Sequence, residues 1–222
     1  SGGVAADDFT KTYSGGGVYL MNSAPLMRGI TFFANFAEQR GGAVWGLNSS
    51  PVFYQCSFQF NRGDRGGALF FEGGSHSLFV CSIEDNYSFG GGAGTYLRGC
   101  TLNIHNTTFL RNRVGDKGTG GAIHLRDSTH ATVTGCEFRD GYGNWEGGAI
   151  AVDSGDLIVA DSGFYDNEAD ERGGAIHCGG STCVIRSCIF ERNETLFAES
   201  GEGGAIQVEN GTADIRRSIF TD

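Results

Sequence analysis

Proline is rare in this sequence, with two among 222 residues, and Lys and Arg are outnumbered by Asp and Glu, 16 to 26. The net charge of −10 and the lack of any basic run argue against nucleic acid as a partner, because phosphate binding needs a basic face. No apolar stretch approaches the roughly 20 residues of a membrane-spanning helix, so no membrane span is predicted.

Glycine is abundant, with 38 residues. Many glycines and few prolines suit short strands that bend repeatedly and suit long helices badly. Charged residues make up 19% and hydrophobic residues 39% of the chain, which is the balance of a folded protein rather than a disordered one. The composition therefore predicts an all-β fold.

A tetrad of Gly-Gly-Ala and a branched apolar residue recurs along the chain, as in Gly173 to Ile176. The copies begin near residues 15, 41, 66, 91, 120, 147, 173 and 203, which gives repeats of 25–30 residues. A period of this length across a whole chain indicates one supersecondary unit stacked on itself.

Alignment of the repeats on a recurring Phe shows which side chains face inward. The aligned column is apolar throughout: Phe32, Phe58, Ile83, Phe109, Phe138, Phe164, Phe190 and Phe220. Small or apolar residues lie two positions earlier and apolar residues five positions earlier, and a further alternating pair follows the glycines. We therefore expect three short strands per repeat in a right-handed parallel β-helix, a pectin-lyase-like solenoid of about eight rungs spaced by roughly 4.8 Å.

The repeat continues to both ends of the chain. Phe220 falls at the Phe position of the eighth copy, and Phe9 precedes Gly15 as the other Phe residues precede their glycines. We expect a half rung around Phe9. Residues 1–222 are therefore predicted to be a single β-helix segment of a longer solenoid.

An Asn follows the Phe by three positions in most repeats. The members of this column are Asn35, Asn61, Asn86, Asn112, Asn167 and Asn193. Asn tolerates left-handed backbone geometry at a corner, and stacked amides can bond one another along the rod. We predict a structural Asn ladder at one corner, interrupted and more mobile at Gly141.

Repeat length varies almost wholly between the Asn and the next Gly-Gly. The two longest connections, Arg113 to Thr119 and Glu194 to Glu202, read as polar loops on one edge of the rod. Insertions on one edge of a solenoid often form its binding face. The alternative for either loop is a tolerated surface insertion.

Four of the seven cysteines share one inward column, where a thiol behaves as a small hydrophobe: Cys56, Cys81, Cys136 and Cys188. Cys178 and Cys183 flank a short turn and are a candidate disulfide. No cysteine spacing suits zinc, so no metal site is predicted.

Five Asn-x-Ser/Thr sequons occur, at Asn48, Asn86, Asn106, Asn193 and Asn210. Asn86 and Asn193 belong to the ladder, where an engaged amide is a poor acceptor for a glycan. The candidate glycosylation sites are therefore Asn48, Asn106 and Asn210, and they matter only in a eukaryotic secretory pathway. Coincidence in a chain rich in Asn, Ser and Thr is the alternative.

Parallel β-helices often carry polysaccharide lyases and glycosidases, so an enzyme is an alternative. Such sites need clustered carboxylates, and a patch of Asp161, Asp214, Arg186 and Arg216 is the nearest candidate. The acidic stretch of Asp166, Glu168, Asp170 and Glu171 matches no calcium loop. His124 and His177, at equivalent outward positions, lack a nucleophile at a recognisable elbow. We predict no catalytic residue and no cofactor.

The pairing of Gly-Gly-Ala-Ile (Gly173 to Ile176) with Phe-x-x-Asn (Phe190 to Asn193) resembles the repeat of chlamydial polymorphic membrane proteins over residues 15–222. Those proteins are autotransporters whose β-helical passenger is displayed at the cell surface and used in adhesion. Related repeats occur in large extracellular proteins of algae and other protists. The resemblance implies an extracellular or cell-surface rod that binds protein or glycan partners, and it carries over no catalytic residue.

Three functions follow as expectations. The first is a non-enzymatic adhesin or structural scaffold, in which stacked rungs hold loops at a repeating separation so that weak contacts add. The second is a subunit of an extracellular filament, partnered by neighbouring copies. The third is a carbohydrate-active enzyme.

Overall fold

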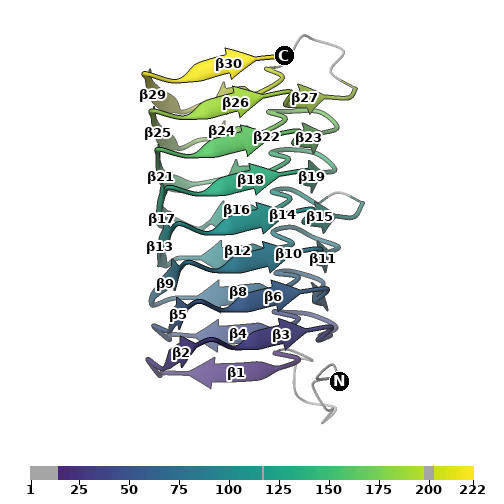
Figure 1. Ribbon diagram of the computed structural model, residues 1–222, viewed down its shortest axis with the longest axis vertical. Coiled ribbons are helices and arrows are strands. Elements are labelled where there is room, and N and C mark those ends of the chain that lie inside the picture. The colour runs from purple at the N-terminus through teal and green to yellow at the C-terminus, as the bar shows by residue number, and fades with distance from the viewer. Residues whose placement is uncertain (1–14, 117, 198–202) are drawn as a thin grey trace.

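The computed structural model describes residues 15–116, 118–197 and 203–222, and every regular element in these ranges is a β-strand. Figure 1 shows the strands as a stack of rungs, from β1 (Val18–Met21) at the bottom to β30 (Ile219–Thr221) at the top. The half rung predicted around Phe9 lies outside the described residues.

Strands at the same place in successive rungs pair in parallel, and the pairing produces four sheets. Sheet I, which follows each Gly-Gly, contains β1, β4 (Val44–Leu47), β8 (Leu69–Glu72), β12 (Thr95–Arg98), β16 (Ile123–Arg126), β20 (Ile150–Val152), β24 (Ile176–Gly179) and β28 (Ile206–Glu209). Sheet II contains β2 (Leu26–Arg28), β5 (Val52–Tyr54), β9 (Ser75–Phe79), β13 (Thr101–His105), β17 (Thr129–Thr134), β21 (Gly155–Ala160), β25 (Thr182–Arg186) and β29 (Thr212–Arg216).

The other two sheets lie on either side of the Asn corner. Sheet III carries the Phe column on β3 (Thr31–Phe33), β6 (Ser57–Gln59), β10 (Ser82–Glu84), β14 (Thr108–Leu110), β18 (Glu137–Arg139), β22 (Gly163–Tyr165), β26 (Ile189–Glu191) and β30. Sheet IV contains the two-residue strands β7 (Arg62–Gly63), β11 (Tyr87–Ser88), β15 (Arg113–Val114), β19 (Tyr142–Gly143), β23 (Glu168–Ala169) and β27 (Glu194–Thr195).

The predicted all-β solenoid of about eight rungs is confirmed, but the expectation of three strands per repeat is wrong. The fourth strand lies between the Asn and the glycines. Sequence periodicity missed it because two residues are too few to show an alternating pattern.

The core is the interior of the stack, and the Phe column forms its longest stretch of touching rings. The Phe138 ring centroid lies 4.7 Å from that of Phe109 and 4.8 Å from that of Phe164, and the ring planes are nearly parallel. Phe138 and Phe164 are fully buried. Along this stretch each rung therefore covers the aromatic face of the rung before it, as the alignment on Phe predicts.

The paired glycines are required by the corner that they form. Gly41 has φ of +60°, which is the left-handed region, and a Cβ on Gly42 would lie 2.2 Å from the carbonyl oxygen of Gly67 in the next rung. The first glycine supplies the backbone conformation and the second allows the rungs to approach each other.

Candidate functional site

The Asn corner lies between sheets III and IV, and its amides bond along the rod. Nδ2 of Asn35 donates to Oδ1 of Asn61 at 2.9 Å, and the same bond runs from Asn61 to Asn86 and from Asn86 to Asn112, at 3.0 Å each. The backbone N–H of Asn61 also donates to Oδ1 of Asn86, at 2.9 Å. These side chains are buried, so the ladder holds the corner rigidly from rung to rung.

The ladder is interrupted at Gly141, as the sequence predicts. The backbone N–H of Gly141 donates to Oδ1 of Asn167 at 3.1 Å, and the amide bonding resumes between Asn167 and Asn193 at 2.9 Å. The break therefore removes one side chain but keeps one backbone hydrogen bond across it. Greater mobility at this corner stays a prediction.

The left-handed residue at this corner is not the Asn, contrary to expectation. It is the residue before it in each rung: Ala34, Phe60, Asp85, Arg111, Asp140, Asp166 and Arg192, with φ between 49° and 54°. The reversal at that residue turns the Asn side chain inward, where Nδ2 of Asn167 also donates to the carbonyl oxygen of Phe138 at 3.1 Å. The Asn column is therefore selected by its inward hydrogen bonds rather than by backbone preference.

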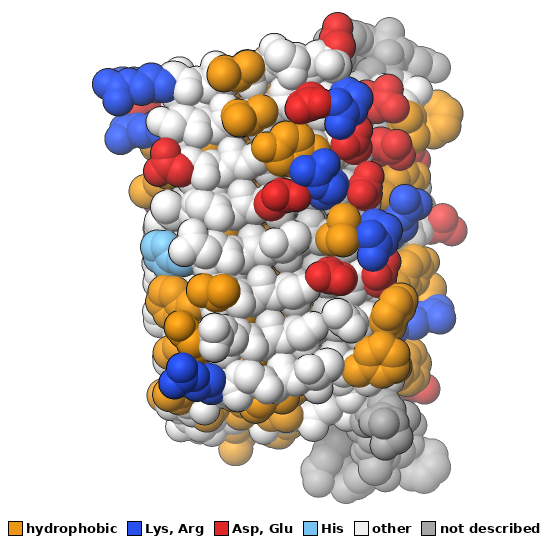
Figure 2. Space-filling model, in the orientation of Figure 1, with side chains coloured by type: hydrophobic (Ala, Val, Ile, Leu, Met, Phe, Trp, Pro, Cys, Tyr) orange, Lys and Arg blue, Asp and Glu red, His pale blue; other side chains and the backbone are white. Residues whose placement is uncertain are grey.

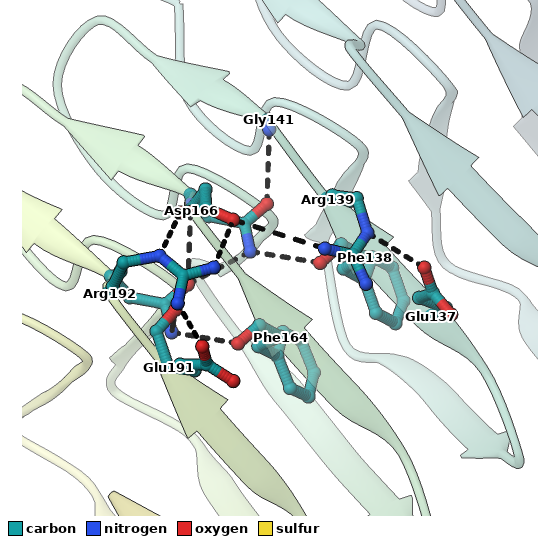
Figure 3. A network of polar contacts seen from close by, with 10 residues as sticks. Glu137, Phe138, Arg139, Gly141, Phe164, Asp166, Glu191 and Arg192 are labelled. Atoms are coloured by element: carbon teal, nitrogen blue, oxygen red, sulfur yellow. Dashed lines mark hydrogen bonds and ion pairs between the residues drawn. The ribbon is translucent and has the colours of Figure 1, made fainter. Parts of the chain in front are cut away.

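Outside the ladder, charged side chains pair across the rungs (Figure 3). Arg192 donates to both carboxylate oxygens of Asp166, at 2.6 and 3.0 Å, and it also contacts Glu191. Arg139 donates to Glu137 at 2.8 Å and lies 3.9 Å from Asp166. The hydrogen bonds from Arg192 lower the pKa of Asp166. Asp166 is thus an ionised partner of an arginine.

The rest of the acidic stretch is divided among different roles. Asp170 accepts hydrogen bonds from the Tyr142 hydroxyl at 2.8 Å and from Asn144 at 3.0 Å, whereas Glu168 lies in register with Glu194 of the next rung. Within the described ranges, no group of three or more His, Cys, Asp or Glu has an arrangement suited to a metal ion.

The two long loops both begin in sheet IV, at β15 and β27, which lie on the same edge of the rod (Figure 1). Thr119, at the end of the first loop, is buried, and its hydroxyl lies 3.0 Å from Nδ1 of His124. The prediction that the second loop is polar is wrong in part. The loop contains Leu196 and Phe197, and both side chains are exposed. Residues 198–202 of that loop lie outside the described residues.

His124 and His177 point away from the core, as predicted, but they are buried at 3% exposure each. Thr119, directly before Gly120, contacts His124, and Glu146, directly before Gly147, contacts His177. Nε2 of His124 lies 3.1 Å from Asp153, and Nδ1 of His177 lies 3.3 Å from Glu146. Both imidazoles therefore lie in enclosed polar surroundings, with a carboxylate beside each and the Thr119 hydroxyl beside His124.

His76 is a buried titratable group that sequence reasoning missed. Its ring stacks on Phe71 with centroids 3.9 Å apart, and it is fully buried. Burial lowers its pKa to about 4, which the backbone of Gly73 only partly offsets. The sequence signal that could have identified His76 as inward-facing is its register partner Leu102, an apolar residue at the same position in the next rung.

The proposed carboxylate patch does not assemble as a pair. Asp214 lies between Arg216, at 2.6 Å, and Arg186, at 3.3 Å, while Asp161 belongs to a corner two rungs away. Burial would raise the pKa of Asp214, but the two arginines outweigh it and the pKa is lowered. A lowered pKa does not suit a general acid.

Cys178 and Cys183 form the candidate disulfide, with an S–S distance of 1.96 Å and a Cα–Cα distance of 6.6 Å. The other five cysteines are free and buried. Burial raises the pKa of Cys100 to about 12 and those of Cys81 and Cys136 to about 11, so these thiols are protonated.

The inward cysteine column also contains hydroxyl residues, and these hydroxyls accept hydrogen bonds from the preceding rung, which sequence reasoning did not foresee. The backbone N–H of Cys81 donates to Oγ1 of Thr107 at 3.2 Å, and that of Cys136 donates to Oγ of Ser162 at 3.1 Å. The thiol of Cys56 donates to the carbonyl of Met27 at 3.4 Å. Cys, Ser and Thr therefore share this column because each offers a small polar atom at a buried corner.

The three candidate glycan acceptors are exposed corner residues. Asn48, Asn106 and Asn210 all have left-handed backbone conformation, with φ of 48°, 49° and 53°. Asn86 is buried in the ladder and donates to the carbonyl of Phe58 at 3.0 Å. The three exposed amides are therefore accessible to a glycosylating enzyme, whereas the amide of Asn86 is buried and hydrogen-bonded.

Parallel rungs with four sheets and interior side-chain ladders define a β-solenoid protein. The chain belongs to the right-handed β-helix region family, whose model matches residues 1–143 and 114–222. It is 30% identical over 119 residues to metabotropic glutamate receptor-like protein R of Dictyostelium discoideum, a match that covers 54% of this chain and 7% of the relative. The chain thus spans a small part of that protein's length. No solved structure matches it significantly.

The part of the chain that the structure describes contains no helix capable of spanning a bilayer.

Proposed function

We propose that this chain is a non-enzymatic extracellular rod that acts as an adhesin or structural scaffold and presents loops on one edge to protein or glycan partners. The observation that carries the proposal is the continuous register of eight rungs, with both long connections beginning in sheet IV, beside the Asn corner. A rigid rod with repeated loops suits many weak contacts, which add through multivalency.

Two features support a location outside the cytosol. The Cys178–Cys183 disulfide suits an oxidising compartment, and three exposed sequons suit a secretory route. The repeat resembles that of chlamydial polymorphic membrane proteins, and the relative in Dictyostelium is named a receptor-like protein, which favours a cell-surface role.

Binding to cells tests the proposal. Beads coated with the chain should bind cell surfaces, and the free monomer should bind far more weakly because it lacks avidity. A variant whose residues 113–119 are replaced by the shorter connection 62–65 should lose binding while its circular dichroism is unchanged. Equal binding by bead-bound and free protein, or no loss in the loop variant, would contradict the proposal.

Incubation with a panel of polysaccharides tests the enzymatic alternative. We expect no turnover, because Asp214 is held by two arginines and no second carboxylate faces it. Turnover that disappears in Asp214→Asn would replace the adhesin with an enzyme.

A subunit of an extracellular filament is the second candidate. Exposed apolar side chains at opposite ends of the rod favour it, notably Leu26 on β2 and Phe197 after β27.

A further inference from the structure

A groove lies on the outer face of sheet II near the first rungs. It has a volume of about 520 Å³ and is lined by Leu26, Arg28, Val52, Tyr54 and Phe79. Its side chains stand in register, with Leu26 beside Val52 and Tyr54 beside Phe79. Leu26 is 69% exposed, so a large aliphatic surface is open to solvent.

The groove combines this apolar surface with a single cation. The guanidinium of Arg28 lies 4.9 Å from the ring centroid of Tyr54, and within the described ranges it forms no ion pair. None of the lining residues is acidic, although the chain carries a net charge of −10. The groove therefore suits an apolar side chain that has a carboxylate beside it.

The lining is poorly suited to a sugar. Saccharide hydroxyls need many hydrogen-bond partners, and only Arg28 and the Tyr54 hydroxyl are polar side-chain groups here. The aliphatic side chains of Leu26 and Val52 instead match another aliphatic or aromatic side chain. A polypeptide partner is thus favoured.

The chain itself carries a segment with the matching chemistry. Phe197 is 70% exposed and Leu196 is exposed beside it, directly after β27. Backbone hydrogen bonds from Leu196 to Ala169, at 2.9 Å, and from Phe197 to Asp170, at 2.8 Å, fix the base of this segment. An apolar pair is therefore held on an ordered base rather than left on a free tail.

Two carboxylates lie at the base of this segment. Glu194 is exposed and lies in register with Glu168, and neither forms an ion pair with another described residue. Figure 2 shows acidic side chains, with basic ones among them, on the right of the upper half and hydrophobic ones at the lower left. The two surfaces are complementary in both charge and polarity.

We propose that the Leu196–Phe197 segment of one copy docks in the Leu26, Arg28, Val52, Tyr54 and Phe79 groove of another, so that the rods assemble in an open series. Figure 1 places β27 at the upper right and β2 and β5 at the lower left, so the two surfaces lie on opposite edges and at opposite ends. One partner cannot satisfy both surfaces at once. The contact is heterologous and does not close into a dimer.

This inference specifies the filament candidate and does not depend on receptor binding. Sedimentation velocity over a roughly hundredfold range of protein concentration tests it, because the mass of an open series rises with concentration. The wild-type chain should exceed a dimer at the upper end. Leu196→Ser with Phe197→Ser should remain monomeric, and Ile158→Ser, an exposed site on sheet II outside the groove, should assemble like the wild type.

Mixing two defective variants gives the sharpest result. A loop variant (Leu196→Ser with Phe197→Ser) keeps its groove, and a groove variant (Leu26→Ser) keeps its loop. Each should be monomeric alone, and an equal mixture should stop at a one-to-one dimer. Arg28→Glu should weaken assembly about tenfold, and adding Glu194→Arg should restore it.

Circular dichroism shows that each variant is folded. A wild type that stays monomeric at the highest concentration would overturn the contact, and so would a loop variant that assembles as the wild type does. Either result would leave binding of beads to cells unaffected, so this inference and the proposed function can fail separately.

Discussion

The side-chain amide of Asn61 donates a hydrogen bond to the side-chain oxygen of Asn86 in the next rung at 3.0 Å, and both residues are buried. Asn61 also accepts from Asn35 and donates to the carbonyl of Phe32. One side chain thus connects three rungs.

Asn61→Ala should lower the free energy of unfolding by about 3 kcal/mol, because it removes the buried side-chain hydrogen bonds that Asn61 makes to Asn35, Asn86 and the Phe32 carbonyl. Asn103→Ala is the matched control, since Asn103 is half-buried on the outer face of β13 and should change stability by less than about 0.5 kcal/mol. Urea unfolding measures both. Equal losses in the two variants would show that the ladder adds nothing.

Phe138→Ala should cost about 3–5 kcal/mol, because it opens a cavity between two stacked rings. Phe60→Ala removes a ring of the same size that is 54% exposed, and should cost less than about 1 kcal/mol. The midpoint of denaturant unfolding distinguishes them. A small loss at Phe138 would mean that the neighbouring rungs collapse into the space.

His76 should make stability depend on pH. Its folded pKa of about 4 lies below its unfolded value near 6.5, so the unfolded chain binds more protons between these values. Stability from this site is therefore complete above pH 6.5 and falls as the pH drops towards 4, by about 2 kcal/mol at pH 4.5.

His76→Leu should remove that part of the pH dependence, since Leu102 fills the same position in the next rung. Urea unfolding at pH 7 and pH 4.5, compared between wild type and variant, isolates the histidine from other titrating groups. A variant that loses as much stability as the wild type would assign the pH dependence elsewhere.

The sequence predicted the columns of inward-facing residues well, because the same positions recur in every repeat, including those of the Phe and Asn residues. It could not reveal that Asp166 rather than Asn167 adopts the left-handed conformation, because Asn has the same local preference and only the stacked hydrogen bonds decide. The burial of His124 was likewise hidden, because it depends on how the folded chain brings Thr119 and Asp153 against its ring.

The exposed pair Leu196 and Phe197 was also missed, since its acidic neighbours make the loop read as polar. Whether an apolar side chain is exposed depends on the folded rod, and the spacing of the sequence repeats does not show it. The groove around Tyr54 was not predicted either, because the side chains that line it are far apart in sequence.

The Cys178–Cys183 disulfide gives the last prediction. Thiol titration of the denatured, unreduced chain should find five free thiols, and seven would contradict the disulfide. Cys178→Val with Cys183→Ala matches the register neighbours Val152 and Ala213, so it removes the cross-link with little change in packing. The variant should lose about 2 kcal/mol, the value expected when a short loop is no longer closed in the unfolded chain. Reduction of the wild type should produce a similar loss and leave the variant unchanged, because the variant has no bond to reduce.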